Sequence, residues 1–285
     1  MKLISICPSN TELAAYLGLA PSLIGVDDFS DWPAEISGLP RLGPDLNIDM
    51  DKVEALQPDL VLASLSVPGM ERNIEELEKR NIPYMIVPNP KTLKEVGDCI
   101  LFVGKVTNTS EKAEQLFEKF NRILSFYESL SHQVGRPKSL YWEWWAKPIF
   151  TPGAANWLTE ISRLAGGRNV FEDRPEASVQ TDWDDVKERN PEVICVVWVG
   201  IHKKKVNPKV ILKRPGWEEI EAIQNDQLYI LDEPLYCRPS PLLLNGLAQI
   251  AYILHPDIYP PYEEGKDLLM DFKFFKKIVR RRSVC

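Results

Sequence analysis

The sequence predicts an α/β fold of two similar lobes, each with a central parallel sheet, joined by one long α-helix, with a ligand cleft between the lobes. Residues 51–64 (DKVEALQPDLVLAS) recur as residues 184–197 (DDVKERNPEVICVV), with Pro58 and Pro191 at matching places. In both halves, apolar strand patterns alternate with helical patterns, which is typical of a parallel sheet. Ligand pockets favour domain interfaces and the carboxyl ends of parallel strands, so we expect the function in that cleft.

The first lobe, residues 1–107, alternates strand and helix. A capping box is expected at Ser9 and Glu12, at the start of a helix that contains Asn10. In an alternative that is compatible with the first, Asn10 is a ligand-binding residue, and the N–H groups of this helix end bind an anionic part of the ligand. In the repeated segment the helix ends at Gln57, because Pro58 cannot continue it. The expected strands lie at 2–7, 23–26, 60–63 and 84–87, and the helices at 10–17, 51–56, 70–80 and 92–103.

A connecting helix is expected within residues 108–134. Asn108 and Glu111 have the spacing of an N-cap pair, and apolar residues then recur at helical intervals. This pattern predicts a helix over 109–133, which would serve as a rigid connector between the lobes.

The second lobe, residues 135–257, repeats the alternation. In the strand that holds Tyr141-Trp142-Glu143-Trp144-Trp145, successive side chains point to opposite faces. We expect Trp142 in the core and Trp144 near the end of the strand. The expected strands lie at 139–144, 193–199 and 227–231, and the helices at 157–165, 184–189, 217–222 and 242–254.

Residues 258–285 form an extension that ends in KFFKKIVRRR. Its mixture of apolar and basic residues predicts an amphipathic terminal helix. Two alternatives are open: a helix that packs on the lobe or is solvated, and a helix that makes weak contact with a membrane surface.

Composition excludes several classes of function. The net charge of −7 argues against a nucleic-acid partner. Five widely spaced cysteines (Cys7, Cys99, Cys195, Cys237 and Cys285) indicate mostly buried thiols rather than disulfides or a zinc knuckle. No signal-peptide pattern or membrane span is visible, so either the protein works in the cytoplasm or the chain begins after a removed leader.

The sequence indicates neither an enzyme nor a protein-bound metal ion. It contains no P-loop, no G-x-G-x-x-G after the first strand and no G-x-S-x-G elbow. His132, His202 and His255 lie in different predicted elements, so they cannot form a metal cage. No intrinsic cofactor is expected, and the ligand should be an organic chelate.

Several motifs, in order, resemble one known family. They are CPSNTE, GVDDFSDWP, VEALQPDLVLAS, FTPGAANWLTEISRLAGGRNVF, RPGW and CRPSPLLLNGLAQIAYILHP, which together span most of residues 2–257. They are similar to the helix-backbone (class III) solute-binding proteins of metal-chelate ABC importers, and most similar to the branch that binds vitamin B12 or cobalamin. Members of this family normally act outside the cytoplasmic membrane. The B12 binder carries a tryptophan where this chain has Ser64-Leu65-Ser66.

The resemblance implies a monomer that captures cobalamin or another corrinoid and delivers it to an ABC importer permease. Two alternatives are a binder of ferric siderophore or haem, and a cytoplasmic corrinoid-handling or chelatase-related protein. For the ligand wall it implies Trp32 from the first lobe, with cover of the lobe edge as the alternative, and Trp144 from the second. Trp198 ends the expected strand at 193–199 and is expected to close the same pocket.

Two further ligand contacts are expected in the segment that opens the last helix. Arg238, beside the positive end of that helix, suits an anionic group better than a structural ion pair. Tyr236 is its companion contact, with a core role as the alternative. For docking to the permease, alignment with the B12 binder points to Glu71 on the first lobe and Glu219, or Glu218, on the second.

Overall fold

The computed structural model describes residues 1–282, which form two compact units. The first unit contains residues 1–90, 94–120 and 239–241. The second contains residues 91–93, 121–238 and the described residues from 242 onward. The boundary falls inside α5 (Ser110–Ser131), which gives its first half to one unit and its second half to the other.

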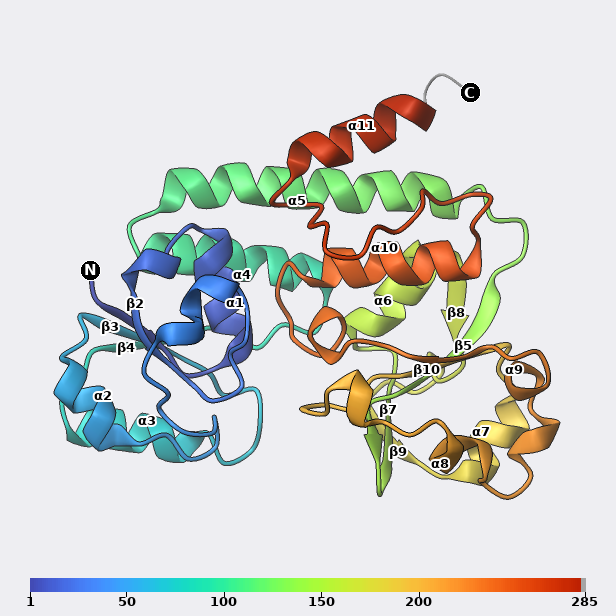
Figure 1. Cartoon of the computed structure of the whole chain (residues 1–285), viewed down its shortest axis with the longest axis horizontal. Coiled ribbons are helices and arrows are strands. Elements are labelled where there is room, and N and C mark those ends of the chain that lie inside the picture. The colour runs from blue at the N-terminus through green and yellow to red at the C-terminus, as the bar shows by residue number, and fades with distance from the viewer. Residues whose placement is uncertain (283–285) are drawn as a thin grey trace. The chain divides into compact units, whose positions relative to one another are not determined.

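The first unit has a four-stranded parallel sheet in the order β2-β1-β3-β4 (Figure 1). All its strands were predicted: β1 (Leu3–Ser5), β2 (Leu23–Val26), β3 (Leu60–Ala63) and β4 (Tyr84–Ile86). Apolar side chains of α2 and α3 pack on one face of the sheet, and α1 and α4 lie on the other (Figure 1). These helices span Pro8–Tyr16 (α1), Met50–Leu56 (α2), Glu71–Lys79 (α3) and Leu93–Val106 (α4).

The second unit has a parallel sheet in the order β11-β10-β5-β8 and a small antiparallel sheet, β6-β7-β9. The prediction found β5 (Lys138–Glu143), β10 (Val193–Val196) and β11 (Leu228–Ile230). It missed β6 (Trp145–Ala146), β7 (Ile149–Pro152), β8 (Gly167–Asn169) and β9 (Ser178–Thr181).

Helices cover both faces of the parallel sheet in the second unit. In Figure 1, α6 and α10 lie on one side, and α7, α8 and α9 on the other. The α-helices are α6 (Trp157–Leu164), α7 (Trp183–Arg189), α8 (Lys209–Leu212), α9 (Glu221–Gln224), α10 (Leu243–Leu254) and α11 (Phe272–Arg282). Short 3₁₀ helices are η1 (Ala20–Ser22), η2 (Ala34–Gly38), η3 (Lys203–Lys205), η4 (Trp217–Glu219) and η5 (Glu233–Leu235).

The repeated segment is confirmed as one structural unit used twice. Gln57, after α2, and Asn190, after α7, both adopt the left-handed conformation, with φ of 50° and 42°. This conformation ends the helix, and the following proline cannot re-enter it, so the chain extends into β3 or β10. Two distant parts of the sequence therefore make the same turn into the centre of a sheet.

Both predicted caps are wrong. Helix α1 begins at Pro8 with Cys7 as its N-cap, because proline is favourable in the first turn. Ser9 therefore lies inside the helix, and Glu12 instead accepts a hydrogen bond from the Ser240 hydroxyl. Asn108 follows α4 with φ of 57°, so it belongs to the end of that helix and does not cap α5.

The extension packs against the second unit. Tyr259 is buried, its ring stacks on that of Tyr127, and its hydroxyl donates to the Leu164 carbonyl over 2.7 Å. In α11, Phe275 is buried against Phe126, at 5.4 Å between ring centroids. Tyr259 and Phe275 thus bind the extension to α5 through aromatic contacts.

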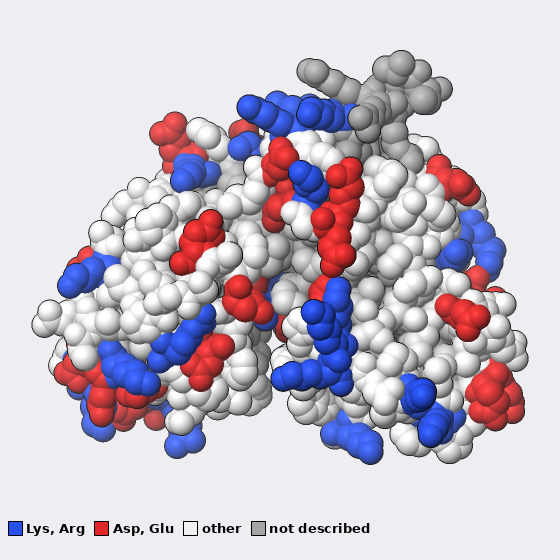
Figure 2. All heavy atoms as spheres, in the orientation of Figure 1, with Lys and Arg blue, Asp and Glu red and all other residues white. Residues whose placement is uncertain are grey.

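The burial of Phe275 agrees with the first of the two alternatives for the tail, a helix that packs on the lobe or is solvated. Basic side chains gather at the place of α11 in Figure 2, and Lys273, Lys276 and Lys277 are exposed there. Contact of this basic face with a membrane surface stays a prediction. Within residues 1–282, no helix combines the length and apolar character needed to cross a bilayer.

Trp142 is confirmed as a core residue, and its replacement should destabilise the second unit. The side chain is 0% exposed, its indole N–H donates to Ser162 Oγ over 2.8 Å, and its ring packs on Tyr236. We expect Trp142→Ala to lower the free energy of unfolding by roughly 3 to 5 kcal/mol, measured by urea denaturation. Trp142→Phe, which keeps most of the volume, should cost clearly less; equal losses would contradict the packing argument.

His255, at the end of α10, should make stability depend on pH. Its Nε2 lies 2.8 Å from the Gly166 carbonyl oxygen, and burial lowers the pKa of the imidazole, although that hydrogen bond acts in the opposite direction. The unfolded chain, with a pKa near 6.5, then binds more protons than the folded chain, so stability falls as the pH drops below about 6.5.

The test compares the parent with His255→Gln by urea denaturation at about pH 7.5 and about pH 5.5. The parent should lose more stability between the two values than the variant. The same loss in both proteins would show that His255 does not contribute.

Candidate ligand-binding surface

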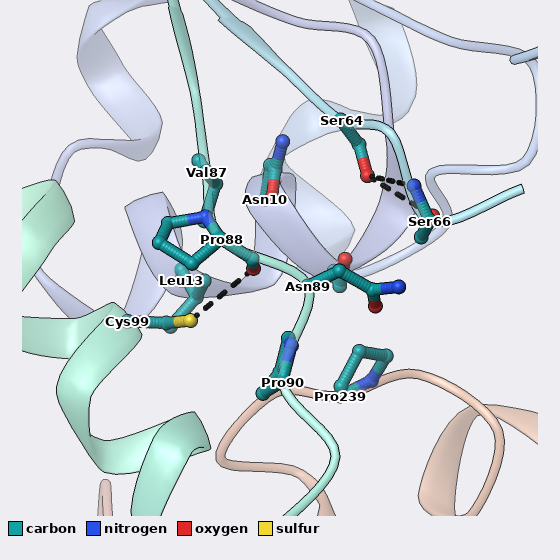
Figure 3. A pocket seen from close by; sticks show the side chains of 11 residues that line it. Asn10, Leu13, Ser64, Ser66, Val87, Pro88, Asn89, Pro90, Cys99 and Pro239 are labelled. Atoms are coloured by element: carbon teal, nitrogen blue, oxygen red, sulfur yellow. Dashed lines mark hydrogen bonds between the residues drawn. The ribbon is translucent and has the colours of Figure 1, made fainter. Parts of the chain in front are cut away.

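A small pocket lies in the first unit where its strands end (Figure 3). Ser9 and Asn10 follow β1, Ser64 and Ser66 follow β3, and Asn89 follows β4. Parallel strands all end at the same edge of a sheet, which explains why these distant residues meet. The remaining lining residues are apolar or thiol side chains: Leu13, Val87, Pro88, Pro90, Cys99 and Pro239.

The pocket is neutral and rich in hydrogen-bonding groups. Ser66 N–H donates to Ser64 Oγ over 3.1 Å, and the two hydroxyls are 3.0 Å apart, so the loop after β3 folds back on itself (Figure 3). Asn10 is buried and donates its amide to the Ala63 carbonyl over 2.9 Å, which fixes the end of β3. No Lys, Arg, Asp or Glu lines the pocket among the described residues. Such a surface suits amide or hydroxyl groups of an organic ligand.

Burial favours the protonated thiol at the two cysteines beside the pocket, Cys7 and Cys99. Cys99 donates its thiol to the Pro88 carbonyl over 3.4 Å, and burial raises its pKa to about 12. Burial also raises the pKa of Cys7. A thiol is neither a strong nucleophile nor a strong metal ligand. Cys7, Cys99 and Cys195 are buried as predicted and Cys237 is half-buried, whereas Cys285 lies outside the described residues.

In each unit, exposed apolar side chains follow strands of the parallel sheet. They are 36 to 46% exposed: in the first unit Phe29 after β2 and Leu65 and Val67 after β3, and in the second Trp145 in β6, directly after β5, and Val199 and Ile201 after β10. We call these six residues, three in each unit, the apolar rim. Large apolar side chains left exposed at the end of a strand are candidates for ligand contact. The sequence analysis missed them, although an apolar residue directly after a strand, where a polar turn is usual, was a visible signal.

The structure places the three expected tryptophans at the same edges. Trp32 is half-buried after β2, with its ring 4.9 Å from that of Tyr16. Trp144 is half-buried at the end of β5, with its ring 6.2 Å from that of Trp157. Trp198 is half-buried after β10. None of the three is fully buried, and contact with ligand stays a prediction for each.

Two expected contacts need correction. Tyr236 is 0% exposed, and its hydroxyl bonds to the Gly246 carbonyl and to Gln249, so it occupies the core, which was the alternative. Arg238 forms an ion pair with Glu233 over 3.2 Å, and both side chains are nearly buried. Arg238 is therefore part of a structural ion pair with a residue of η5, so the expectation that it avoids one is wrong.

The candidate docking residues are exposed. Glu71 lies in the first turn of α3 and accepts from the Gly69 N–H over 2.7 Å. Glu219 lies in η4, is 66% exposed and pairs with Lys187 over 2.9 Å. Glu218 beside it is also exposed. Contact with a permease stays a prediction for all three.

Side-chain metal coordination has no support in the part of the chain that the structure describes. No group of three or more His, Cys, Asp or Glu side chains there could hold a metal ion. The one histidine beside the apolar rim, His202, accepts the Lys204 N–H with Nδ1 and so serves as the cap of η3.

Comparisons with known proteins agree with this architecture. Residues 3–235 match the family model described as "Periplasmic binding protein". An uncharacterized ABC transporter substrate-binding lipoprotein, YvrC of Bacillus subtilis (strain 168), is 29% identical over 262 residues, which cover 90% of this chain and 81% of the relative. A vitamin B12-binding protein of Vibrio cholerae is 27% identical over 254 residues, which cover 89% of this chain and 88% of the relative.

Solved structures show the same fold. The periplasmic vitamin B12 binding protein of Vibrio cholerae has a TM-score of 0.68 and 26% identity, covering 89% of this chain and 96% of that one. A periplasmic heme-binding protein from Roseiflexus has a TM-score of 0.80 at 18% identity, covering 90% and 98%. At that identity the second match shows the fold alone.

The chain belongs to the periplasmic binding protein family. It has the two parallel-sheet lobes of the class III members, as the sequence predicted. Membership makes it a solute-binding protein rather than an enzyme.

Proposed function

We propose that this protein is the substrate-binding component of an ABC importer and captures a metal chelate with residues that follow its parallel strands. The observation that carries the proposal is the apolar rim together with the half-buried Trp32, Trp144 and Trp198. Rigid aromatic walls bury on the order of 150 to 250 Å² each and lose little side-chain entropy, so they suit a broad, flat ligand. The names of the relatives support the transporter role.

Within that class, we favour cobalamin or another corrinoid. A corrin ring carries amide side chains around an apolar body, and the neutral pocket of Ser9, Asn10, Ser64, Ser66 and Asn89 offers hydroxyl and amide partners for them. A bare cation would need charged ligands that this pocket lacks. Ferric siderophore and haem remain the comparison ligands, because Ser64-Leu65-Ser66 replaces the tryptophan of the B12 binder.

Trp144 should contribute directly to ligand affinity. Truncating an aromatic anchor in a desolvated site typically costs about 2 kcal/mol, or roughly thirtyfold in the dissociation constant. We therefore expect Trp144→Ala to bind cyanocobalamin roughly thirtyfold more weakly in isothermal titration calorimetry, and Trp144→Phe to recover part of the loss. If Trp144→Ala binds cyanocobalamin, haemin and a ferric siderophore as the parent does, the site is misplaced. If the parent binds none of them, the proposed function is wrong.

Glu71 and Glu219 should act in delivery rather than in capture. Both carboxylates are exposed. The resemblance to the B12 binder implies that they meet arginines of the permease, and like charges brought together across an interface cost several kcal/mol. We expect the double variant Glu71→Lys, Glu219→Lys to abolish uptake in cells that carry the cognate importer while its affinity for ligand stays that of the parent. Glu75→Lys is the matched control, since Glu75 is an exposed glutamate one turn further along α3. Normal uptake by the double variant would refute the docking assignment.

A further inference from the structure

An ion pair is buried at the end of β5 in the second unit, next to Trp144 in the chain. Glu143, the last residue of β5, is 0% exposed, and Arg214 is 3% exposed. The guanidinium binds both carboxylate oxygens, with Nη1–Oε2 at 2.5 Å and Nη2–Oε1 at 2.7 Å. Removing two charges from water is costly unless the geometry is good and the remaining hydrogen bonds are formed. A buried ion pair is weak evidence for stability, so we expect this one to have another role.

Two further donors complete the shell of the carboxylate. The Tyr141 hydroxyl donates to Oε2 over 2.9 Å, and the Trp198 indole N–H donates to Oε1 over 3.0 Å. Burial, and after it the Glu143 charge, raises the pKa of Tyr141 well above its usual value, so this hydroxyl remains a donor. Each oxygen thus receives one bond from Arg214 and one from an aromatic side chain, and only Trp198 among these groups also reaches the surface.

Arg214 comes from the RPGW motif, which the proposed ligand contacts do not use. Its guanidinium lies over the Trp217 ring at 4.4 Å and near the Trp183 ring at 5.5 Å. Gly216 has φ of 76°, which favours glycine, and this turn leads into η4 with Trp217 in the core. The motif therefore places Arg214, which lies in the loop between α8 and η4, against the end of β5.

Backbone hydrogen bonds at the end of β5 also join the segments that carry Trp144 and Trp198. Val197 N–H donates to the Glu143 carbonyl over 2.9 Å, and Val199 N–H donates to the Trp144 carbonyl over 3.0 Å. The backbone is thereby fixed on both sides of Trp198. The side chain of Trp198 packs partly against the core of the second unit, and the bond from its indole N–H to Glu143 fixes the direction of the ring.

We infer that Glu143 and Arg214 are positioning residues that hold the Trp198 indole in the orientation needed for ligand binding. The inference rests on the proposed function. A charged acceptor gives a shorter and stronger hydrogen bond than a neutral one. Arg214 holds this acceptor in place by binding both of its oxygens. A wall fixed before binding loses less freedom when the ligand arrives, so preorganisation raises affinity.

A paired replacement tests this without leaving a lone buried charge. Glu143→Leu with Arg214→Met removes both charges, and Tyr141→Phe removes the hydroxyl that would lose its acceptor. Apolar replacements of a complete buried pair are often tolerated, whereas removing one partner is not. The matched control is Tyr141→Phe alone, which leaves the acceptor of Trp198 intact. Arg214→Lys is a milder variant that retains the charge but not the two-pronged geometry.

The variants are titrated with cyanocobalamin by calorimetry in the parent and in a Trp198→Phe background, which has no indole N–H. If the pair acts through Trp198, the triple variant should weaken binding about tenfold in the parent and less than about twofold in the Trp198→Phe background. Arg214→Lys should show a smaller loss with the same dependence on Trp198, and Tyr141→Phe should show none. An equal loss in both backgrounds, or no loss in a folded triple variant, would overturn the inference.

A second measurement needs no ligand and separates this inference from the proposed function. In protein labelled with 5-fluorotryptophan, the ¹⁹F resonance of Trp198 is assigned by its absence in Trp198→Phe. We expect one sharp line in the parent and a broadened or split line in the triple variant and in Arg214→Lys. An unchanged line in either folded variant would refute positioning, whatever the protein binds. Failure of the parent to bind any chelate, with the line changed, would refute only the proposed function.

Discussion

Parallel pairing of the four strands in each unit is the constraint on which the candidate site depends. Because parallel strands run the same way, the loops after β1, β2, β3 and β4 leave one edge of the first sheet, and those after β5, β10 and β11 leave one edge of the second. The neutral pocket lies at this edge of the first sheet, and Trp32, Trp144 and Trp198 follow β2, β5 and β10. Within each unit, strand direction brings side chains that are far apart in the sequence to one edge of the sheet.

The main strands could be predicted because a buried parallel strand is an apolar run, and here a left-handed residue and a proline mark where two of them begin. Gln57-Pro58 and Asn190-Pro191 gave that signal twice. Strand β8, Gly167–Asn169, gave none, since it is defined by pairing with β5 rather than by its own composition. The two caps failed for local reasons: Pro8 moved the start of α1, and the positive φ of Asn108 belongs to the end of α4.

The site was predictable where the position along a strand decides it and not where long-range pairing does. Trp142, inside the predicted strand, is buried, whereas Trp144, at its end, is half-buried. Nothing in the sequence showed that Gln249 would bind the Tyr236 hydroxyl, or that Glu233 would take Arg238. The bond between Glu143 and Arg214 joins residues far apart in the chain. In the sequence, RPGW is one of the motifs of the family resemblance, and nothing there predicts the partner of Arg214. Whether an apolar loop residue such as Leu65 is exposed depends on the finished fold.

Native mass spectrometry of the purified protein, offered cyanocobalamin, haemin and a ferric siderophore together, is the most direct test of the central claim that the protein is a binder of intact metal chelates. The account predicts that one chelate is retained at one per chain, with cyanocobalamin favoured, and that the metal-free siderophore and a bare metal ion are not. Retention of none of the chelates, or of a bare metal ion instead, would contradict it.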